Sequence, residues 1–260
     1  MLTIAGSDSG GGAGIQADLR TIALLGVHAC VAVTAVTVQN TLGVNAFHAI
    51  PDDVIAGQME AVVTDIGIQA AKTGMLASAD IVGAVAATWR RLQLTVPLVV
   101  DPVCASMHGD PLLAPAALDS LREQLFPLAT LVTPNLDEVR LLVGVDVVDE
   151  ESQRTAAKAL HALGPRWVLV KGGHLRSSGR SRDLLYGGTE YHEFDAERIR
   201  TGNDHGSGDT LAAAIACALA HGHTVADAVD FGKRWVTECL RAAYPLGHGH
   251  GPVSPLFRLT

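Results

Sequence analysis

The sequence predicts an α/β fold of three layers, with helices on both faces of a mostly parallel central sheet and antiparallel strands at its edges. Short apolar runs of β type alternate with longer amphipathic stretches, which is typical of right-handed βαβ units. The composition agrees: 48% of the 260 residues are apolar, 27 are glycine and only 4% are aromatic, which suits tightly packed strands and small-residue helices. At this length we expect one domain over residues 1–260.

Six apolar runs predict the parallel strands, each followed by a turn and a helix. In chain order they are "LTIA" at 2–5, "CVAVTAV" at 30–36, "AAKTGML" at 70–76, "PLVVD" at 97–101, "TLVTPN" at 130–135 and "WVLVKGG" at 167–173. Three other segments alternate between apolar and polar residues, which predicts antiparallel edge strands or a hairpin. These are "VNAFHAI" at 44–50, "RDLLYGG" at 182–188 and "EYHEFDA" at 190–196.

Charge and composition exclude several classes of partner. The net charge of −8 provides no basic field for a nucleic acid. No apolar run approaches the roughly 20 residues that cross a bilayer, and "MLTIA" at 1–5 is too short for a signal sequence. The four cysteines stand in apolar runs without the spacing of metal ligands, so we expect buried free thiols and a cytoplasmic protein.

The segment "NDHGSGDTLAAAIACALAHG" at 203–222 predicts a buried helix whose first turn binds an anion. From Thr210 to Ala220 the helix has hardly a polar face. Its free N–H groups, with "GSG" at 206–208, allow an anion to approach the backbone closely. We therefore expect the N–H groups of Gly206, Ser207 and Gly208 to bind a phosphoryl group, and Asp209 to act as general base. The alternative is an ordinary N-cap by Ser207 or Asp209.

Polar clusters follow several of the predicted strands, and the carboxyl ends of parallel strands share one crevice. The first, "GSDSGGGAG" at 6–14, lacks the pattern of a Walker A loop and of a dinucleotide fingerprint. A flat ligand could lie against its backbone, or it could be only a tight turn. Asp18, just beyond it, is either a first-turn charge or a ligand contact.

The motif "TPNLDE" at 133–138 places two oxygen ligands on one helix face. Asn135 and Glu138 stand three residues apart, so they could hold a hard cation, or they could simply form a capping box. Asp101 ends an apolar strand and is followed by Pro102, which favours a position in the crevice beside the same Mg²⁺. Lys171 ends another strand, where its ammonium could neutralise phosphate charge.

Together these motifs resemble the hydroxymethylpyrimidine and phosphomethylpyrimidine kinases of thiamine biosynthesis, in the ribokinase-like superfamily. The match runs from residue 2 to about 252 and includes "TIAGSDSGGGAGIQADL", "TAVTVQNTLGV", "AAKTGML", "DPV", "GDPLL", "TPNLDE", "LVKGGH" and "HGSGDTLAAAI" in this order. The resemblance implies a ribokinase-like αβα sandwich and a homodimer. It also implies phosphorylation of 4-amino-5-hydroxymethyl-2-methylpyrimidine by ATP, and then of its monophosphate to the diphosphate.

The resemblance also implies a role for each site residue. Gln39 in "VQN" would read the pyrimidine edge, since a carboxamide offers a donor and an acceptor. The remaining implied contacts are Gly6, Asp18, Met75 and Val103 for the substrate; Lys171, Asn135, Thr201 and Lys233 for ATP and its phosphates; and Asp101 and Glu138 for Mg²⁺. Met75 could equally be a plain core residue.

Three positions depart from the pattern of these kinases. The chain has Asp209 where they usually carry Cys, Asp204 where they usually carry Thr, and Met107 where several carry Lys. We expect the Asp204 side chain to point outward or to pair with Arg200 or Lys171. Two alternative functions stay open: a pyridoxal or pyridoxine kinase, and a non-catalytic vitamin-binding relative.

Overall fold

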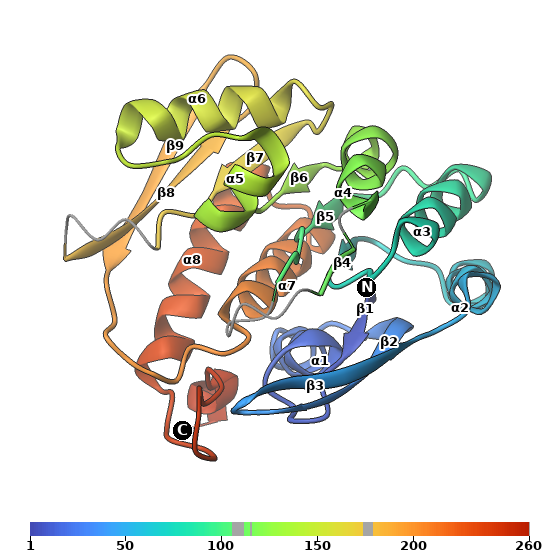
Figure 1. The fold of residues 1–260 in the computed structure, drawn as a ribbon, viewed down its shortest axis with the longest axis horizontal. Helices are drawn as coiled ribbons and strands as arrows, with labels where there is room; N and C mark the ends of the chain where they lie inside the picture. The colour runs from blue at the N-terminus through green and yellow to red at the C-terminus, as the bar shows by residue number, and fades with distance from the viewer. Residues whose placement is uncertain (106–111, 115, 174–178, 260) are drawn as a thin grey trace.

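The computed structural model describes residues 1–105, 112–114, 116–173 and 179–259. In these residues the strands form a single sheet of nine, in the order β3-β2-β1-β4-β5-β6-β7-β8-β9 (Figure 1). Their bounds are β1 Leu2–Ser7, β2 Cys30–Asn40, β3 Gly43–Ala49, β4 Ala71–Thr73, β5 Leu98–Val100, β6 Leu131–Val132, β7 Trp167–Val170, β8 Arg180–Tyr186 and β9 Tyr191–Glu197.

The strand directions follow the sequence patterns. Strands β2, β1, β4, β5, β6 and β7 are parallel, whereas β3, β8 and β9 pair antiparallel at the two edges, as the alternating segments predict. One detail of the prediction is wrong. The second and the last apolar run are each followed by an antiparallel strand, β3 and β8, and not by a turn and a helix.

Helices cover both faces of this sheet, which confirms the predicted three layers. Successive strand residues point to opposite faces, so Leu98 and Val100 pack in one apolar cluster and Val99 packs in the other. The first cluster includes residues of α2, α3, α5 and α6, and the second includes residues of α1, α7 and α8. The helices are α1 Gly14–Leu24, α2 Asp52–Asp65, α3 Ala79–Arg91, α4 Ala116–Ser120, α5 Leu136–Val143, α6 Glu150–His161, α7 Ser207–Ala220 and α8 Val225–Arg241, with short η1 Leu121–Leu125, η2 Phe126–Leu128 and η3 Pro255–Leu259.

Helix α7 is buried over most of its length, as its sequence predicts. All residues from Thr210 to Leu219 are buried. The four cysteines are free and buried, which confirms the prediction of reduced core thiols. None of the helices in the described part of the chain has the length and apolar character needed to cross a membrane.

The C-terminal segment returns to the amino-terminal half of the sheet. The N–H of His205, just before α7, donates to the Gly251 carbonyl at 3.0 Å, and the N–H of His250 donates to the Thr41 carbonyl at 2.9 Å. Thr41 follows β2 directly. Segments from both ends of the chain therefore meet beside the carboxyl end of β2.

Candidate active site

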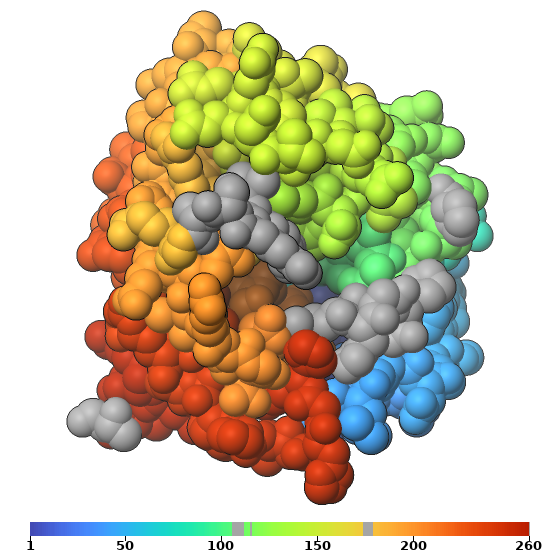
Figure 2. Space-filling model, turned by 60° about the vertical axis from the view of Figure 1, so that its left-hand side comes forward, coloured from blue at the N-terminus to red at the C-terminus, as the bar shows by residue number. Residues whose placement is uncertain are grey.

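A cavity of about 620 Å³ opens at the carboxyl ends of the parallel strands. Figure 2 shows this hollow near the centre of one face, between the yellow-green residues above and the orange and red residues beside and below. Its size falls in the range of small-molecule sites. Residues at the ends of β1, β2, β4, β5, β6 and β7 line it, together with the start of α7: Gly6, Gln39, Met75, Asp101, Asn135, Lys171 and Asp209. The crevice predicted from the polar clusters therefore exists.

Two glycine-rich segments meet at the start of α7. Gly206 is the N-cap in the left-handed region, with φ of 76°. A Cβ atom there would lie 2.0 Å from the Gly12 carbonyl oxygen. A Cβ atom on Gly12 would in turn lie 2.3 Å from Cδ2 of His205. Only glycines permit this approach, which accounts for Gly206 and Gly12 better than a plain loop would.

The N–H groups at this helix start are only partly free for an anion. The Ser207 N–H donates to the Asp204 carbonyl at 3.1 Å, so the predicted phosphoryl contact from Ser207 conflicts with a bond already made. Gly206 and Gly208 stand at positions whose N–H groups have no acceptor within the helix. Gly208 faces Asp101 and Lys171: its Cβ atom would lie 3.4 Å from Asp101 Oδ2 and 3.5 Å from Lys171 Nζ.

Asp209 lines the cavity, and its carboxylate forms an ion pair with the buried Lys72. Its side chain is 14% exposed, and its Oδ1 lies 2.9 Å from Nζ of Lys72. Burial raises the pKa of Asp209, but the charge and hydrogen bond of Lys72 and the Gly14 N–H outweigh burial and lower it. Asp209 is therefore ionised at neutral pH.

Asp18 does not line the cavity, so the expected direct substrate contact requires a correction. Its side chain is 0% exposed, and both of its oxygens bind Lys72 Nζ, at 2.9 and 3.0 Å. The Thr3 hydroxyl also donates to Asp18, at 2.5 Å. The residue that sequence reasoning missed is Lys72. The signal was a lysine in a buried strand, between Ala71 and Thr73.

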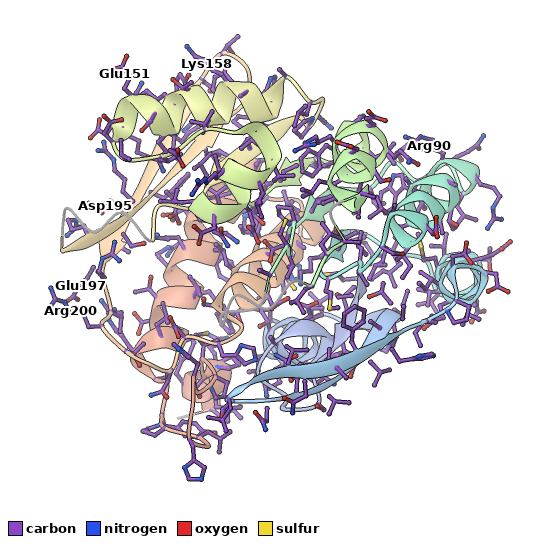
Figure 3. The ribbon with its side chains drawn as sticks, viewed as in Figure 1. Arg90, Glu151, Lys158, Asp195, Glu197 and Arg200 are labelled. Carbon is purple, nitrogen blue, oxygen red and sulfur yellow. The ribbon has the colours of Figure 1, made fainter. Side chains whose placement is uncertain are left out.

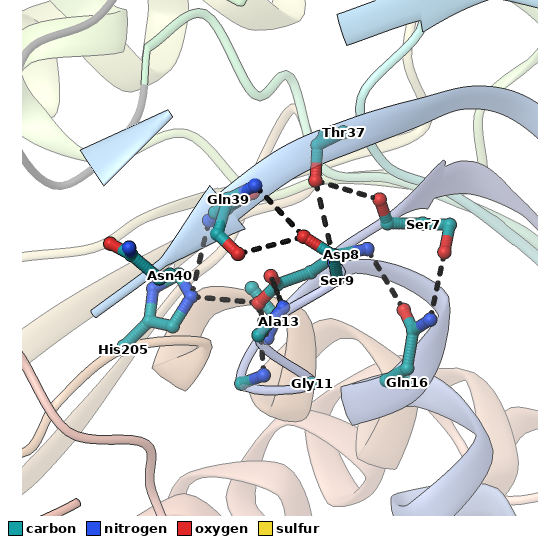
Figure 4. A network of polar contacts seen from close by, with 12 residues as sticks. Ser7, Asp8, Ser9, Gly11, Ala13, Gln16, Thr37, Gln39, Asn40 and His205 are labelled. Carbon is teal, nitrogen blue, oxygen red and sulfur yellow. Dashed lines mark hydrogen bonds and ion pairs between the residues drawn. The ribbon is translucent and has the colours of Figure 1, made fainter. Parts of the chain in front are cut away.

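The first glycine-rich loop is organised by Asp8, another residue that the sequence analysis did not single out. Its carboxylate accepts from the N–H groups of Gly10, Gly12 and Ala13, at 2.7, 2.9 and 2.8 Å (Figure 4). Nε2 of His205 lies 2.9 Å from Oδ2 of Asp8. Burial raises the pKa of Asp8, but His205 and these N–H groups lower it overall. An aspartate two residues before a run of three glycines was the available signal.

Gln39 lies at the end of β2, on the cavity wall. Its Nε2 is 3.3 Å from Nε2 of His205, and its backbone N–H donates to Ser9 Oγ at 2.8 Å (Figure 4). Gly6, Met75 and Val103 also line the cavity, and a Cβ atom on Gly6 would lie 3.2 Å from Sδ of Met75. The structure thus brings together four of the five residues that the resemblance implies for the substrate.

Asp101, Glu138 and Lys171 form a second charged group on the cavity wall. Lys171 Nζ lies 3.0 Å from Asp101 Oδ1, to which the Thr133 hydroxyl also donates at 3.1 Å. Asn135 and Glu138 form the capping box of α5, so the capping alternative holds while both residues also line the cavity.

The two carboxylates fit a divalent cation. Burial, together with the charge of the nearby Asp101, raises the pKa of Glu138 to about 7 against the opposing charge of Lys171. Two buried carboxylates that repel each other are stabilised by a hard cation between them. Among the described residues no cluster of three or more His, Cys, Asp or Glu side chains could hold a metal. Mg²⁺ at nucleotide sites commonly uses only one or two carboxylates, with phosphates and water completing its shell.

Thr201 and Lys233 also line the cavity. Lys233 is not a free cation, because its Nζ lies 2.7 Å from Asp183 Oδ2 and 2.9 Å from Ser181 Oγ. Asp204 pairs with His250, whose Nδ1 lies 3.1 Å from Asp204 Oδ1, and not with Arg200 or Lys171. Figure 3 shows Arg200 beside Glu197 at the outer edge of the molecule. Met107 lies outside the described residues.

Comparison with known proteins agrees with this geometry. Residues 8–254 match the family described as Phosphomethylpyrimidine kinase. The hydroxymethylpyrimidine/phosphomethylpyrimidine kinase of Mycobacterium tuberculosis (strain ATCC 25618 / H37Rv) is 81% identical over 260 residues, which is 100% of this chain and 94% of that protein.

Two solved structures share the fold. An ADP complex of Bacillus subtilis pyridoxal kinase superimposes with a TM-score of 0.91 and 37% identity, over 100% of this chain and 98% of that one. Phosphomethylpyrimidine kinase from Clostridium difficile 630 superimposes with a TM-score of 0.80 and 38% identity, over 91% of this chain and 97% of that one.

Proposed function

Because the chain belongs to the phosphomethylpyrimidine kinase family, we propose that it phosphorylates 4-amino-5-hydroxymethyl-2-methylpyrimidine with ATP and then phosphorylates the monophosphate to the diphosphate. The observation that carries this proposal is the position of Asp209. A buried, ionised carboxylate faces the cavity directly beside the first turn of a buried helix. That pairing supplies a base and an anion site at one point, as phosphoryl transfer requires.

In the proposed reaction, Asp209 takes the proton of the substrate hydroxyl as its oxygen attacks the γ-phosphorus. The N–H groups of Gly206 and Gly208 stabilise the negative charge that develops on the transferring group. Lys171 contributes a cation on the same side, beside Gly208. Catalysis then depends on positioning and charge stabilisation, with no covalent enzyme intermediate.

Gln39 is the proposed reader of the pyrimidine ring. Its amide can donate to a ring nitrogen and accept from the exocyclic amine. Met75 and Val103 provide apolar contact for the ring, and Gly6 allows it to lie against the backbone. His205 contacts both Gln39 and Asp8, so it connects the proposed pyrimidine reader to the loop that follows β1.

ATP and Mg²⁺ are the proposed cofactors. Asp101 and Glu138 would hold Mg²⁺, which neutralises phosphate charge when bound. Asn135 and Thr201 line the cavity where the nucleotide would lie. The charge of Lys233 is already matched by Asp183, so we propose that Lys233 shapes this wall instead of binding phosphate as a free cation.

The test is an assay of the purified protein with ATP, Mg²⁺ and the hydroxymethylpyrimidine, following mono- and diphosphate by mass. Formation of both products in sequence supports the proposal, and no transfer to the pyrimidine refutes it. Pyridoxal kinase activity is a second candidate, favoured by the TM-score of 0.91 with the Bacillus subtilis pyridoxal kinase. The same assay with pyridoxal as the sole acceptor shows whether the protein phosphorylates pyridoxal in addition to the pyrimidine.

We further propose that residues 1–260 fold as one domain, in the cytoplasm, and form a homodimer. The β2–β3 edge carries exposed apolar side chains that a second copy could cover, among them Val36, Val38, Leu42 and Phe47. Sedimentation equilibrium measures the mass in solution. A monomer at all concentrations would contradict the dimer.

A further inference from the structure

Three charged side chains lie in a row beneath the cavity floor. Lys72, from β4, stands between Asp18 of α1 and Asp209 of α7. The side chains of Lys72 and Asp18 are 0% exposed, and only Asp209 reaches the cavity. Asp18 binds Lys72 through both oxygens, whereas Asp209 uses Oδ1 alone.

This row is poorly explained as a contribution to stability. Taking an ammonium and two carboxylates out of water is costly, and a buried ion pair is often matched by apolar side chains of similar volume. At the register of Lys72 the neighbouring strands supply the apolar Val99 on β5 and Thr3 on β1, whose hydroxyl donates to Asp18. The chain nevertheless places a lysine in direct contact with the proposed base.

We propose that Lys72 is a positioning residue for phosphoryl transfer. It holds Oδ1 of Asp209, so that Oδ2 faces the substrate hydroxyl. Asp18 in turn keeps Lys72 in place while Asp209 carries the proton. This inference rests on the proposed function of Asp209 as base. It adds the second carboxylate, Asp18, as the reason that Lys72 does not move during turnover.

The charges balance through the step. The substrate O–H proton moves to Asp209, the hydroxyl oxygen bonds to the γ-phosphorus, and the bond from that phosphorus to the bridging oxygen breaks with its electron pair left on ADP. The row changes from a net charge of −1 to 0 as Asp209 becomes neutral. Lys72 keeps the two Asp18 contacts at 2.9 and 3.0 Å, so no buried ammonium is left unpaired.

Several charged or titratable groups face Asp209. They are Lys72 from β4, Asp18 from α1, His205 from the segment before α7, and Lys171 beyond the end of β7, with Asp101 close to both lysines. Lys72 has the largest lowering effect on the pKa of Asp209. Burial, together with the charge of Asp209, raises the pKa of Asp18 to about 6 in spite of Lys72. The two carboxylates therefore compete for one cation.

Two substitutions should shift the titration of Asp209 in opposite directions. Lys72→Met removes the cation, so burial dominates and the acidic limb of the kcat profile moves to higher pH. Asp18→Asn removes the competing charge and leaves Lys72 to Asp209 alone, so the limb moves to lower pH. We expect kcat of Lys72→Met to fall about 100-fold, the scale of a disabled general base. The Kd values for pyrimidine and ATP should change less than about threefold, since neither side chain reaches the ligands.

The carboxyl titration of Asp209 can also be followed without turnover, by ¹³C NMR of aspartate-labelled protein with the resonance assigned through Asp209→Asn. Leu160→Ala is the control, because it destabilises the fully buried core under α6 without touching the row. It should leave both the pH profile and the Asp209 resonance unchanged.

A double variant and a comparison with the wild type complete the test. If Lys72→Met does not fold, the double variant Lys72→Met/Asp18→Asn removes the buried pair together, and the limb should still move to higher pH. Unchanged pH limbs and resonance in the folded variants would overturn the inference. Absence of transfer to the pyrimidine by the wild type would overturn the proposed acceptor, whereas the NMR titration reports separately whether Lys72 sets the ionisation of Asp209.

Discussion

Replacing Asp8 with asparagine should loosen the first glycine-rich loop by an amount that follows from its contacts. The carboxylate accepts three N–H groups and faces Nε2 of His205. An amide oxygen in the place of Oδ2 can keep the contacts of Gly12, Ala13 and His205, but the amide nitrogen then faces the Gly10 N–H. One unsatisfied donor costs about 1–3 kcal/mol, and the other bonds weaken as the acceptor loses its charge. We expect a loss of about 2–4 kcal/mol in the free energy of unfolding.

Urea unfolding at pH 7 measures this loss, with Asp65→Asn as the matched control on the exposed end of α2. The control should change stability by less than about 0.5 kcal/mol. The pKa of Asp8 is lowered in the folded protein, so its contribution is full above the pKa of the unfolded carboxyl and is lost as the pH falls through the lower folded value. The difference between wild type and Asp8→Asn should therefore shrink below about pH 4. Equal stability of Asp8→Asn and wild type at pH 7 would refute this account of the loop.

Four further predictions concern the cavity. Asp209→Asn should keep ligand binding but lower kcat by about 10²–10⁴, and an unchanged kcat would exclude it as the base. Gln39→Ala should weaken pyrimidine binding by about 1–3 kcal/mol with ATP affinity constant, and calorimetry showing the reverse would place Gln39 on the nucleotide side. Asp204→Thr should leave the Mg²⁺ requirement unchanged and, because it removes one negative charge, lower the KM for ATP modestly at low salt. A large rise in the Mg²⁺ needed for half-maximal rate would instead identify Asp204 as a metal ligand. Gly206→Ala should lower the Tm far more than Gly222→Ala, because both have positive φ but only Gly206 meets a carbonyl oxygen, at 2.0 Å; equal losses would mean that backbone strain alone matters.

The sequence patterns that proved sufficient are local ones. Alternation over 44–50 predicts an edge strand, and the unbroken apolar run after Asp209 predicts a buried helix; both are present. The spacing of Asn135 and Glu138 predicts a helix start, and the structure has the capping box there. Each of these patterns depends on neighbours within a few residues, so the sequence displays it directly.

The contacts that sequence reasoning missed join distant residues. Lys72 and Asp209 are 137 positions apart, and Asp8 and His205 are 197 apart. No periodicity connects such pairs, because the parallel order of the sheet brings them together. Asp18 illustrates the consequence: beside a glycine-rich loop it resembled a ligand contact, but its partner is a lysine 54 positions away, buried under the floor.

The meeting of both chain ends at the substrate end of the cavity has a consequence for biosynthesis. Asp8 and the strand that carries Gln39 leave the ribosome early, whereas His205 and Asp209 follow well over a hundred residues later. On the proposed function, a partly translated chain thus has the loop and the glutamine proposed to read the ring, but neither the proposed base nor the helix start proposed for the phosphoryl group. We expect phosphoryl transfer only after the segment that carries His205 and Asp209 has folded back onto the first strands.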